Sequence, residues 1–126
     1  MNVVIHTIPH NQQRYPTVGD WTWEPNGDLV IKVSDLGDWR YTMLVALHEL
    51  VEVLKCKHDG VSQKSVDDFD IVYEKNRQNG DDSEPGDSVG APYMKQHCLA
   101  TGIERIMASE LDVSWKVYEE VINGLT

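Results

Sequence analysis

The stretch WRYTMLVALHELVEVLKCK, residues 39–57, decides the fold predicted for this chain. At about 100° per residue, its apolar side chains occupy most of the circumference of an α-helix, so we expect a helix that is buried on most sides. The exceptions before its lysine-bearing end are His48, Glu49 and Glu52, which share one arc of roughly 100° on the same helical wheel. The sequence therefore predicts a buried helix with two carboxylates and one imidazole on a single strip.

The residues before this helix have the pattern of strands. Residues 3–8 form a β-branched run, and apolar residues alternate with polar ones over 21–23 and 29–33, on either side of a Pro-Asn-Gly-Asp turn at 25–28. We therefore expect an N-terminal β-hairpin or small antiparallel sheet with one buried face.

The residues after the helix predict further helices. A second is expected over 62–77, a third from Pro92 to about residue 111, and a short fourth that ends near Gly124. Between the second and the third, residues 79–91 contain four acids, three glycines and one proline, a composition that is typical of a loop.

Length and charge limit the classes of protein to consider. A chain of 126 residues builds one core, so we expect a single α+β domain over 1–126, with a β-rich part (1–37) packed on a bundle of three to four helices (38–126). The 21 acidic against 11 basic residues leave a charge of -10, which opposes direct binding to nucleic acid. The chain has no run of roughly 18 apolar residues for a membrane span and no signal peptide, so a cytoplasmic protein is expected.

Acidic side chains recur beside the apolar stripes of the next two helices. Asp67, Asp70 and Glu74 share one arc of the second helix, and His97 and Glu104 lie two turns apart on the third. An ionised carboxylate in a core costs several kcal/mol unless it is compensated, and a divalent cation (Mg²⁺, Mn²⁺, Zn²⁺ or Fe²⁺) would compensate it. The alternative is that these acids are solvated faces and that the histidines are hydrogen-bonded core residues.

Two acidic pairs carry a first family resemblance. Glu49-Leu-Val-Glu52, followed by Asp67-Asp-Phe-Asp70, resembles the signature of the all-α nucleoside triphosphate pyrophosphohydrolases, which include the MazG and dUTPase-like branches. The resemblance implies that Glu49, Glu52 and Asp70 hold Mg²⁺, which would polarise the phosphate chain of a nucleotide and activate a water. It also implies a homo-oligomer.

The first helix carries a second resemblance, to the zincins, in which a sheet leads into a helix bearing His-Glu-x-x-His. Here the motif reads His48-Glu49-Leu-Val-Glu52, with Glu52 at the position of the second histidine. The resemblance implies a zinc ion bound by His48, Glu52 and His97, with Glu49 as the general base that activates water.

Other residues are candidates for supporting or substrate contacts. Around the ligands and the third helix, these are Asp67, Glu74, Tyr93, Lys95, Glu104 and Arg105. The acids of the loop are expected to be solvated; the alternatives are that they close over a substrate or bind Ca²⁺. They are Asp81, Asp82, Glu84 and Asp87.

We therefore predict a metal-dependent hydrolase with a site built from His48, Glu49, Glu52, Asp70 and His97, and we favour a nucleotide phosphoanhydride as its substrate. A zincin-like zinc hydrolase or peptidase is the first alternative. The second is a non-catalytic, phage-type inhibitor whose carboxylates mimic the phosphates of DNA. Exposed acids would favour mimicry, whereas buried and convergent acids would favour a metal.

Overall fold

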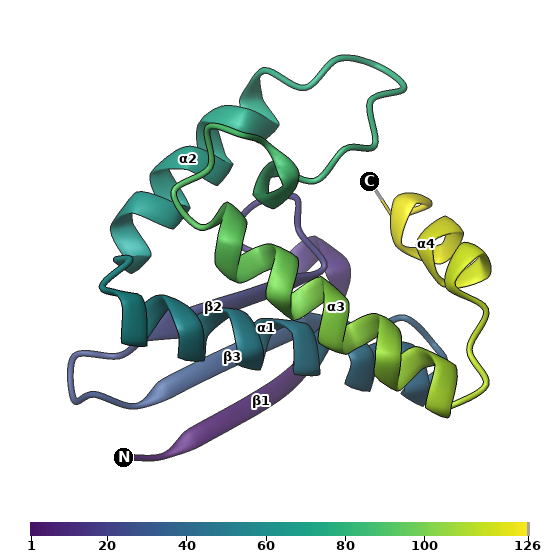
Figure 1. The fold of residues 1–126 in the computed structure, drawn as a ribbon, viewed down its shortest axis with the longest axis horizontal. Helices are drawn as coiled ribbons and strands as arrows, with labels where there is room; N and C mark the ends of the chain where they lie inside the picture. The colour runs from purple at the N-terminus through teal and green to yellow at the C-terminus, as the bar shows by residue number, and fades with distance from the viewer. Residues whose placement is uncertain (126) are drawn as a thin grey trace.

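Three strands form the sheet of the computed structural model, which describes residues 1–125 (Figure 1). Strands β2 (Gly19–Trp23) and β3 (Leu29–Ser34) pair antiparallel around a turn in which Gly27 has a φ of 91°. The predicted hairpin is therefore confirmed. Strand β1 (Val3–Ile8) pairs with β3 in parallel, so the strand order is β1-β3-β2 and the sheet is mixed rather than wholly antiparallel.

The segment between β1 and β2 explains the mixed sheet. It passes over the end of β3, because Ile8 lies opposite Ser34 and Gly19 lies opposite Val33. A short 3-10 turn, η1 (His10–Gln12), lies in this connection. The Oγ of Ser34 contacts Nδ1 of His10 at 2.8 Å, and Gln13 donates from Nε2 to the carbonyl of Lys32. The connection can therefore join two antiparallel strands that are not neighbours.

Helix α1 (Trp39–Asp59) lies against β2 and β3 and buries Leu44, Val45 and Val53. The helix begins after its N-cap residue Asp38, whose carboxylate accepts a hydrogen bond from the backbone N–H of Arg40. Most of its apolar side chains are buried or half-buried, as predicted, but Met43 is 60% exposed and Leu54 is 66% exposed. The sheet and α3 cover two of its faces and leave a third open to solvent.

The remaining helices are α2 (Gln63–Lys75), α3 (Met94–Glu110) and α4 (Trp115–Asn123), and the α+β class is as predicted. Helix α3 packs along α1 on the side away from the sheet (Figure 1). Pro92 precedes α3 instead of occupying its first turn, because Tyr93 is the N-cap residue. None of the described helices combines the length and the apolar character that a membrane span needs.

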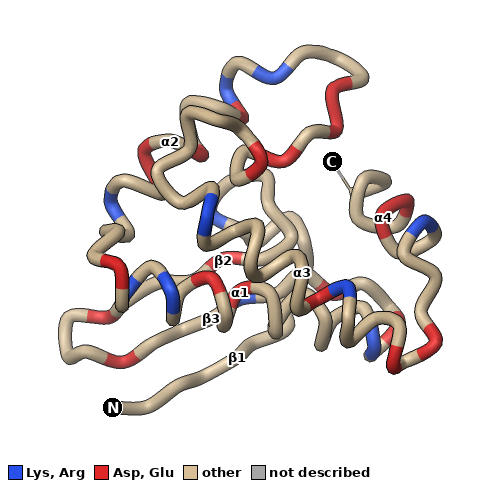
Figure 2. Tube along the Cα trace, in the orientation of Figure 1, with Lys and Arg blue, Asp and Glu red and all other residues tan. Residues whose placement is uncertain are grey.

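The segment that joins α2 to α3 crosses back toward the helix pair and contains one 3-10 turn, η2 (Pro85–Asp87). Figure 2 shows acidic residues along this segment and on the helices that it approaches. Four buried charged or polar side chains gather where α1, α3 and this segment meet; they are His48, Glu52, His97 and Glu104. This junction positions the candidate site.

Candidate metal centre

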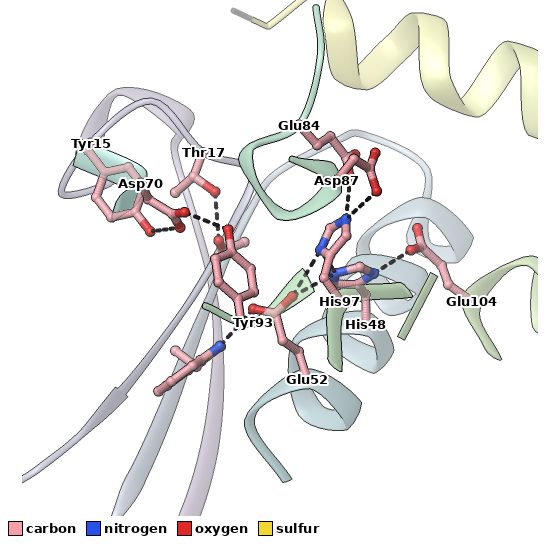
Figure 3. Close-up of polar contacts among 12 residues, drawn as sticks. Tyr15, Thr17, His48, Glu52, Asp70, Glu84, Asp87, Tyr93, His97 and Glu104 are labelled. Carbon is pink, nitrogen blue, oxygen red and sulfur yellow. Dashed lines mark hydrogen bonds and ion pairs between the residues drawn. The ribbon is translucent and has the colours of Figure 1, made fainter. Parts of the chain in front are cut away.

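Three buried side chains converge between α1 and α3 (Figure 3). His48 and Glu52 lie one turn apart on α1, and His97 lies on α3. The Nε2 atom of His48 is 3.2 Å from Oε2 of Glu52 and 3.2 Å from Nδ1 of His97, and these last two atoms are 3.0 Å apart. The three side chains are 6–10% exposed. One nitrogen of each imidazole and one carboxylate oxygen therefore form a small triangle.

The size of this triangle suits one divalent ion. A tetrahedral zinc has nitrogen and oxygen ligands at about 2.0–2.1 Å, which separates neighbouring ligand atoms by about 3.3 Å. The observed separations of 3.0 and 3.2 Å are close to that value. Among the described residues, two sets bring three ligand atoms within 4.8 Å of one another: this buried set, and a second set in which Glu84 and Asp87 are exposed and His97 is shared.

The two side chains of the triangle that α1 supplies, His48 and Glu52, are each held by a further residue. His48 donates from Nδ1 to Oε1 of Glu104 at 2.7 Å, and the other oxygen of Glu104 accepts from the hydroxyl of Tyr118 at 2.6 Å. The indole of Trp21 donates to Oε1 of Glu52 at 3.0 Å. These bonds leave Nε2 of His48 and Oε2 of Glu52 facing the centre, and such supporting bonds are typical of metal-binding histidines.

His97 is held by the segment before α3. Its Nε2 atom lies 2.8 Å from Oε2 of Glu84 and 3.3 Å from Oδ1 of Asp87. The sequence predicts only that these two acids are solvated, close over a substrate or bind Ca²⁺; it predicts no contact between them and His97. The signal that could have found them is the Glu84-Pro-Gly-Asp87 turn, ten residues before His97.

Glu49 lies beside the triangle and is held in a different way. Its side chain is half-buried, lines the cavity in front of His48 and Glu52, and has no hydrogen-bond partner among the described residues. It lies against Gly19 of β2, where an added Cβ would stand 2.6 Å from its Oε1. Burial and the nearby charge of Glu52 raise the pKa of Glu49 well above the usual 4.5.

Asp70 lies apart from the three-ligand set, although it lines the same cavity. Its two carboxylate oxygens accept hydrogen bonds from the hydroxyls of Tyr15 and Tyr93. Burial raises the pKa of Asp70 to about 6, and the two tyrosine hydrogen bonds oppose the shift. The role of Asp70 as a metal ligand therefore stays a prediction. Tyr93, a predicted supporting residue, lies at the cavity and donates to Asp70.

Two acids of α2, Asp67 and Glu74, are paired with arginines. Asp67 accepts from Arg14 at 3.1 and 3.2 Å, and Glu74 accepts from Arg77 at 2.7 and 2.8 Å. Arg14 also binds Asp20, through Nε at 2.7 Å. These two predicted supporting acids are therefore already neutralised at the edge of the cavity.

Lys95 and Arg105, two of the candidates for supporting or substrate contacts, are both exposed on α3. The guanidinium of Arg105 lies 4.9 Å from the centre of the Trp115 ring. Neither residue is among the described residues that line the cavity. The structure therefore does not bring them to the site, because both side chains lie on solvent-exposed parts of α3.

The cavity has a volume of about 130 Å³ and opens between β2, α2 and the segment before α3. The triangle and Glu49 lie at one part of its wall, and Asp70, Tyr15 and Tyr93 lie at another. The candidate ligands and Asp70 therefore share one small cavity.

Proton affinities in the triangle are strongly coupled to burial and charge. Burial lowers the pKa of His97, but its contacts with Glu52 and Glu84 outweigh that effect and raise the pKa to about 10. Burial also lowers the pKa of His48, but its contacts with Glu104 and Glu52 outweigh that effect and raise the pKa well above 6.5. Burial raises the pKa of Glu52, but both histidines overcome this and bring it to about 2. The carboxylates therefore favour protonated histidines, and a bound cation would take the place of these protons.

No family model matches the chain, and the searches of curated proteins and of solved structures find no significantly similar protein. Both family resemblances therefore stay predictions. The zincin-like pattern has its three implied ligands, His48, Glu52 and His97, in one group, with Glu49 beside them. In the pyrophosphohydrolase-like pattern, Glu52 belongs to that group, whereas Asp70 is held by tyrosines.

Proposed function

We propose that this protein is a metal-dependent hydrolase that binds one divalent ion through Nε2 of His48, Oε2 of Glu52 and Nδ1 of His97. The observation that carries the proposal is the convergence of these three atoms within 3.0–3.2 Å, each on a side chain whose other polar atom is held by a further residue. Two imidazoles and one carboxylate suit zinc and related transition metals. Three protein ligands also leave a coordination position for water.

Glu49 is the general base in this proposal. A bound zinc lowers the pKa of its water to about 7, and a carboxylate that accepts the water's proton completes the nucleophile. Glu49 suits this task because it lines the cavity beside the ligands and makes no competing hydrogen bond among the described residues. Its raised pKa brings it nearer to that of the water, which favours proton transfer.

We favour an amide or ester, the substrate of a zincin-like hydrolase, as the substrate of this protein. A magnesium site of the pyrophosphohydrolase type would need the free carboxylates of α2. Asp67 and Glu74 are instead bound by arginines, and each oxygen of Asp70 accepts a hydrogen bond from a tyrosine hydroxyl. A single transition-metal ion at the triangle requires none of these contacts to break.

Cleavage of a nucleotide phosphoanhydride is kept as the second candidate. One observation favours it: Glu49, Glu52 and Asp70, the acids of that resemblance, line the same cavity. This candidate also carries the expectation of a homo-oligomer. Mimicry of DNA is disfavoured, because Glu52 is 4% exposed and Asp70 is 7% exposed.

The test begins with the metal content of the purified protein. We expect one zinc or similar ion per chain, and hydrolysis of a generic peptide or ester substrate. Magnesium-dependent release of pyrophosphate from nucleoside triphosphates would support the second candidate instead. Failure to bind any divalent ion would overturn both.

The variant Glu52→Gln tests the ligand assignment. We expect it to lose the ion and the activity, because an amide oxygen is a weaker ligand than a carboxylate, while its far-UV circular dichroism stays that of the wild type. Glu110→Gln removes the same charge from the exposed end of α3 and is the matched control. Normal turnover and normal metal content in Glu52→Gln would rule out the proposed site.

A further inference from the structure

The turn that precedes α3 makes direct contact with the outer edge of His97. The side chains of Glu84 and Asp87 flank the η2 turn, and both carboxylates approach Nε2 of His97, at 2.8 and 3.3 Å (Figure 3). The turn is itself ordered by backbone bonds from Asp87 to Glu84 and from Ser88 to Pro85. Two carboxylates are therefore presented to one nitrogen by a short, hydrogen-bonded element.

Gly86 lets the backbone of this turn lie against the imidazole. A Cβ atom at position 86 would stand 2.4 Å from Cγ of His97 and 2.5 Å from its Nδ1. Real Cβ atoms are not found at such distances, so any other residue would push the turn or the ring away. Gly86 is itself buried, which indicates that the turn is packed on the site and does not merely pass over it.

These contacts decide which nitrogen of His97 faces the triangle. A carboxylate 2.8 Å away can only accept, so Nε2 of His97 carries the proton that it donates to Glu84. In the neutral ring the lone pair is then on Nδ1, the atom that lies 3.0 Å from Oε2 of Glu52. The edge-on ring of Tyr93, centred 6.0 Å away, lies beside the imidazole as well.

We propose that Glu84, Gly86 and Asp87 form a clamp that positions His97 for ion binding. This inference rests on the proposed function, and it assigns the acidic segment between α2 and α3 to the metal centre. The clamp holds the tautomer and the orientation in which Nδ1 of His97 is a ligand. Its residues are positioning residues, because they act through His97 and not on a substrate.

A second ion is the competing explanation of the same contacts. Glu84, Asp87 and Nε2 of His97 also bring three ligand atoms within 4.8 Å. An ion there, together with one at the triangle, would require His97 to lose both ring protons. The 2.8 Å separation between Nε2 and Glu84 is that of an ordinary charge-assisted hydrogen bond, which favours the clamp.

The experiment compares the zinc affinity of four variants with that of the wild type, by competition with a chromophoric chelator. Glu84→Ala together with Asp87→Ala removes the clamp carboxylates, and Gly86→Ala displaces the turn without removing a charge. Glu110→Gln and Gly102→Ala are the matched controls, since Glu110 is exposed and a Cβ at Gly102 meets no atom within 4 Å. We expect a loss of about 10- to 100-fold in both clamp variants and no change in the controls, as for other residues that orient metal-binding histidines.

A spectroscopic readout separates positioning from general destabilisation. In long-range ¹H–¹⁵N spectra of the zinc-loaded wild type, we expect the proton of His97 on Nε2 and the metal on Nδ1. In the double variant, this proton signal should broaden or disappear, while the signals of His48 stay in place. If the turn does not position His97, the double variant should keep the signals of both His97 and His48 unchanged.

Each outcome decides between the proposals. A wild type that binds zinc, with clamp variants of equal affinity, would overturn the clamp alone. A wild type that binds no ion would overturn the proposed function and the clamp with it. Two ions per chain, with the second lost in the double variant, would overturn the clamp in favour of a bridged pair.

Discussion

At the scale of single residues, the site depends on the four-residue spacing of His48 and Glu52. Residues four apart lie above one another on a helix, so one ion can contact both without any change in the backbone. Glu49 follows His48 directly and therefore faces a different direction, toward Gly19 of β2. In the proposed function, the same short motif therefore supplies two ligands and one residue that acts on water.

The variant Glu49→Gln separates catalysis from ion binding. We expect its kcat to fall by about 10²- to 10⁴-fold, the range for loss of a general base, with metal content unchanged. The measurement is the hydrolysis rate of the zinc-loaded protein beside its zinc content. Loss of the ion would show that Glu49 is a ligand, as in the pyrophosphohydrolase-like alternative, and an unchanged rate would remove it from the mechanism.

The variant Gly19→Ala tests how Glu49 is positioned. The new Cβ would stand 2.6 Å from Oε1 and 2.7 Å from Cγ of Glu49, so the carboxylate has to move. A displacement of about 1 Å can cost about 100-fold in rate, and we expect a loss of that order in kcat without loss of zinc. Gly102→Ala, which meets no neighbouring atom, is the control. Equal rates in the two variants would contradict the prediction.

At the scale of elements, the site is made where α1 and α3 pack together, and the turn before α3 closes it. Helix α4 contributes through Tyr118, which is fully buried and donates to Glu104. The end of α1 depends on Gly60, which has a φ of 75° and donates its N–H to the carbonyl oxygens of Cys56 and Lys57. This left-handed residue turns the chain toward α2.

We expect Gly60→Ala to lower the free energy of unfolding by about 1–2 kcal/mol, because a Cβ is disfavoured in the left-handed region. Gly102→Ala, inside α3, should be neutral or should stabilise by up to about 1 kcal/mol, because alanine favours the helix. Urea denaturation followed by circular dichroism measures both. Equal urea midpoints for the two variants would show that the left-handed conformation of Gly60 does not contribute to the free energy of unfolding.

At the scale of the whole molecule, the net charge of -10 has a distinct distribution. The six acids that the sequence placed beside apolar stripes are all buried or half-buried; they are Glu49, Glu52, Asp67, Asp70, Glu74 and Glu104. The four acids of the 79–91 segment are exposed, yet two of them reach His97. The acidic surplus is therefore concentrated around one cavity.

This concentration predicts how stability depends on pH in the protein without metal. The pKa of His97 is raised from 6.5 to about 10, so its stabilising contribution is complete below pH 6.5 and is lost as the pH rises to 10. The pKa of Glu52 is lowered to about 2, so its contribution is present above pH 4.5 and is lost as the pH falls to 2. Asp70, with a pKa raised to about 6, favours the folded state at low pH.

We therefore expect the thermal midpoint in the presence of a chelator to fall between pH 6.5 and pH 9. Zinc should reduce this fall, because the ion replaces the protons of the histidines, and its binding should release protons. Differential scanning calorimetry and a pH-indicator titration measure the two effects. A midpoint that rises over this range would contradict the charge states inferred for the triangle.

Local sequence determined the elements and half of the site. The helical period placed His48 and Glu52 on one strip, and the turn at 25–28 determined the hairpin, because both depend on residues close together in the chain. The same reasoning placed β1 in a strand but could not predict its parallel pairing, which depends on the path of the connection between β1 and β2.

Only the tertiary structure decided the other half of the site. It brought His97 to Glu52 across 45 positions of sequence, directed Asp70 to two tyrosines, and set Glu84 on His97. These choices depend on how α3 packs on α1 and on where buried carboxylates find donors, and no local pattern encodes either. The sequence by itself determined which chemical groups were available, and packing decided which of them meet.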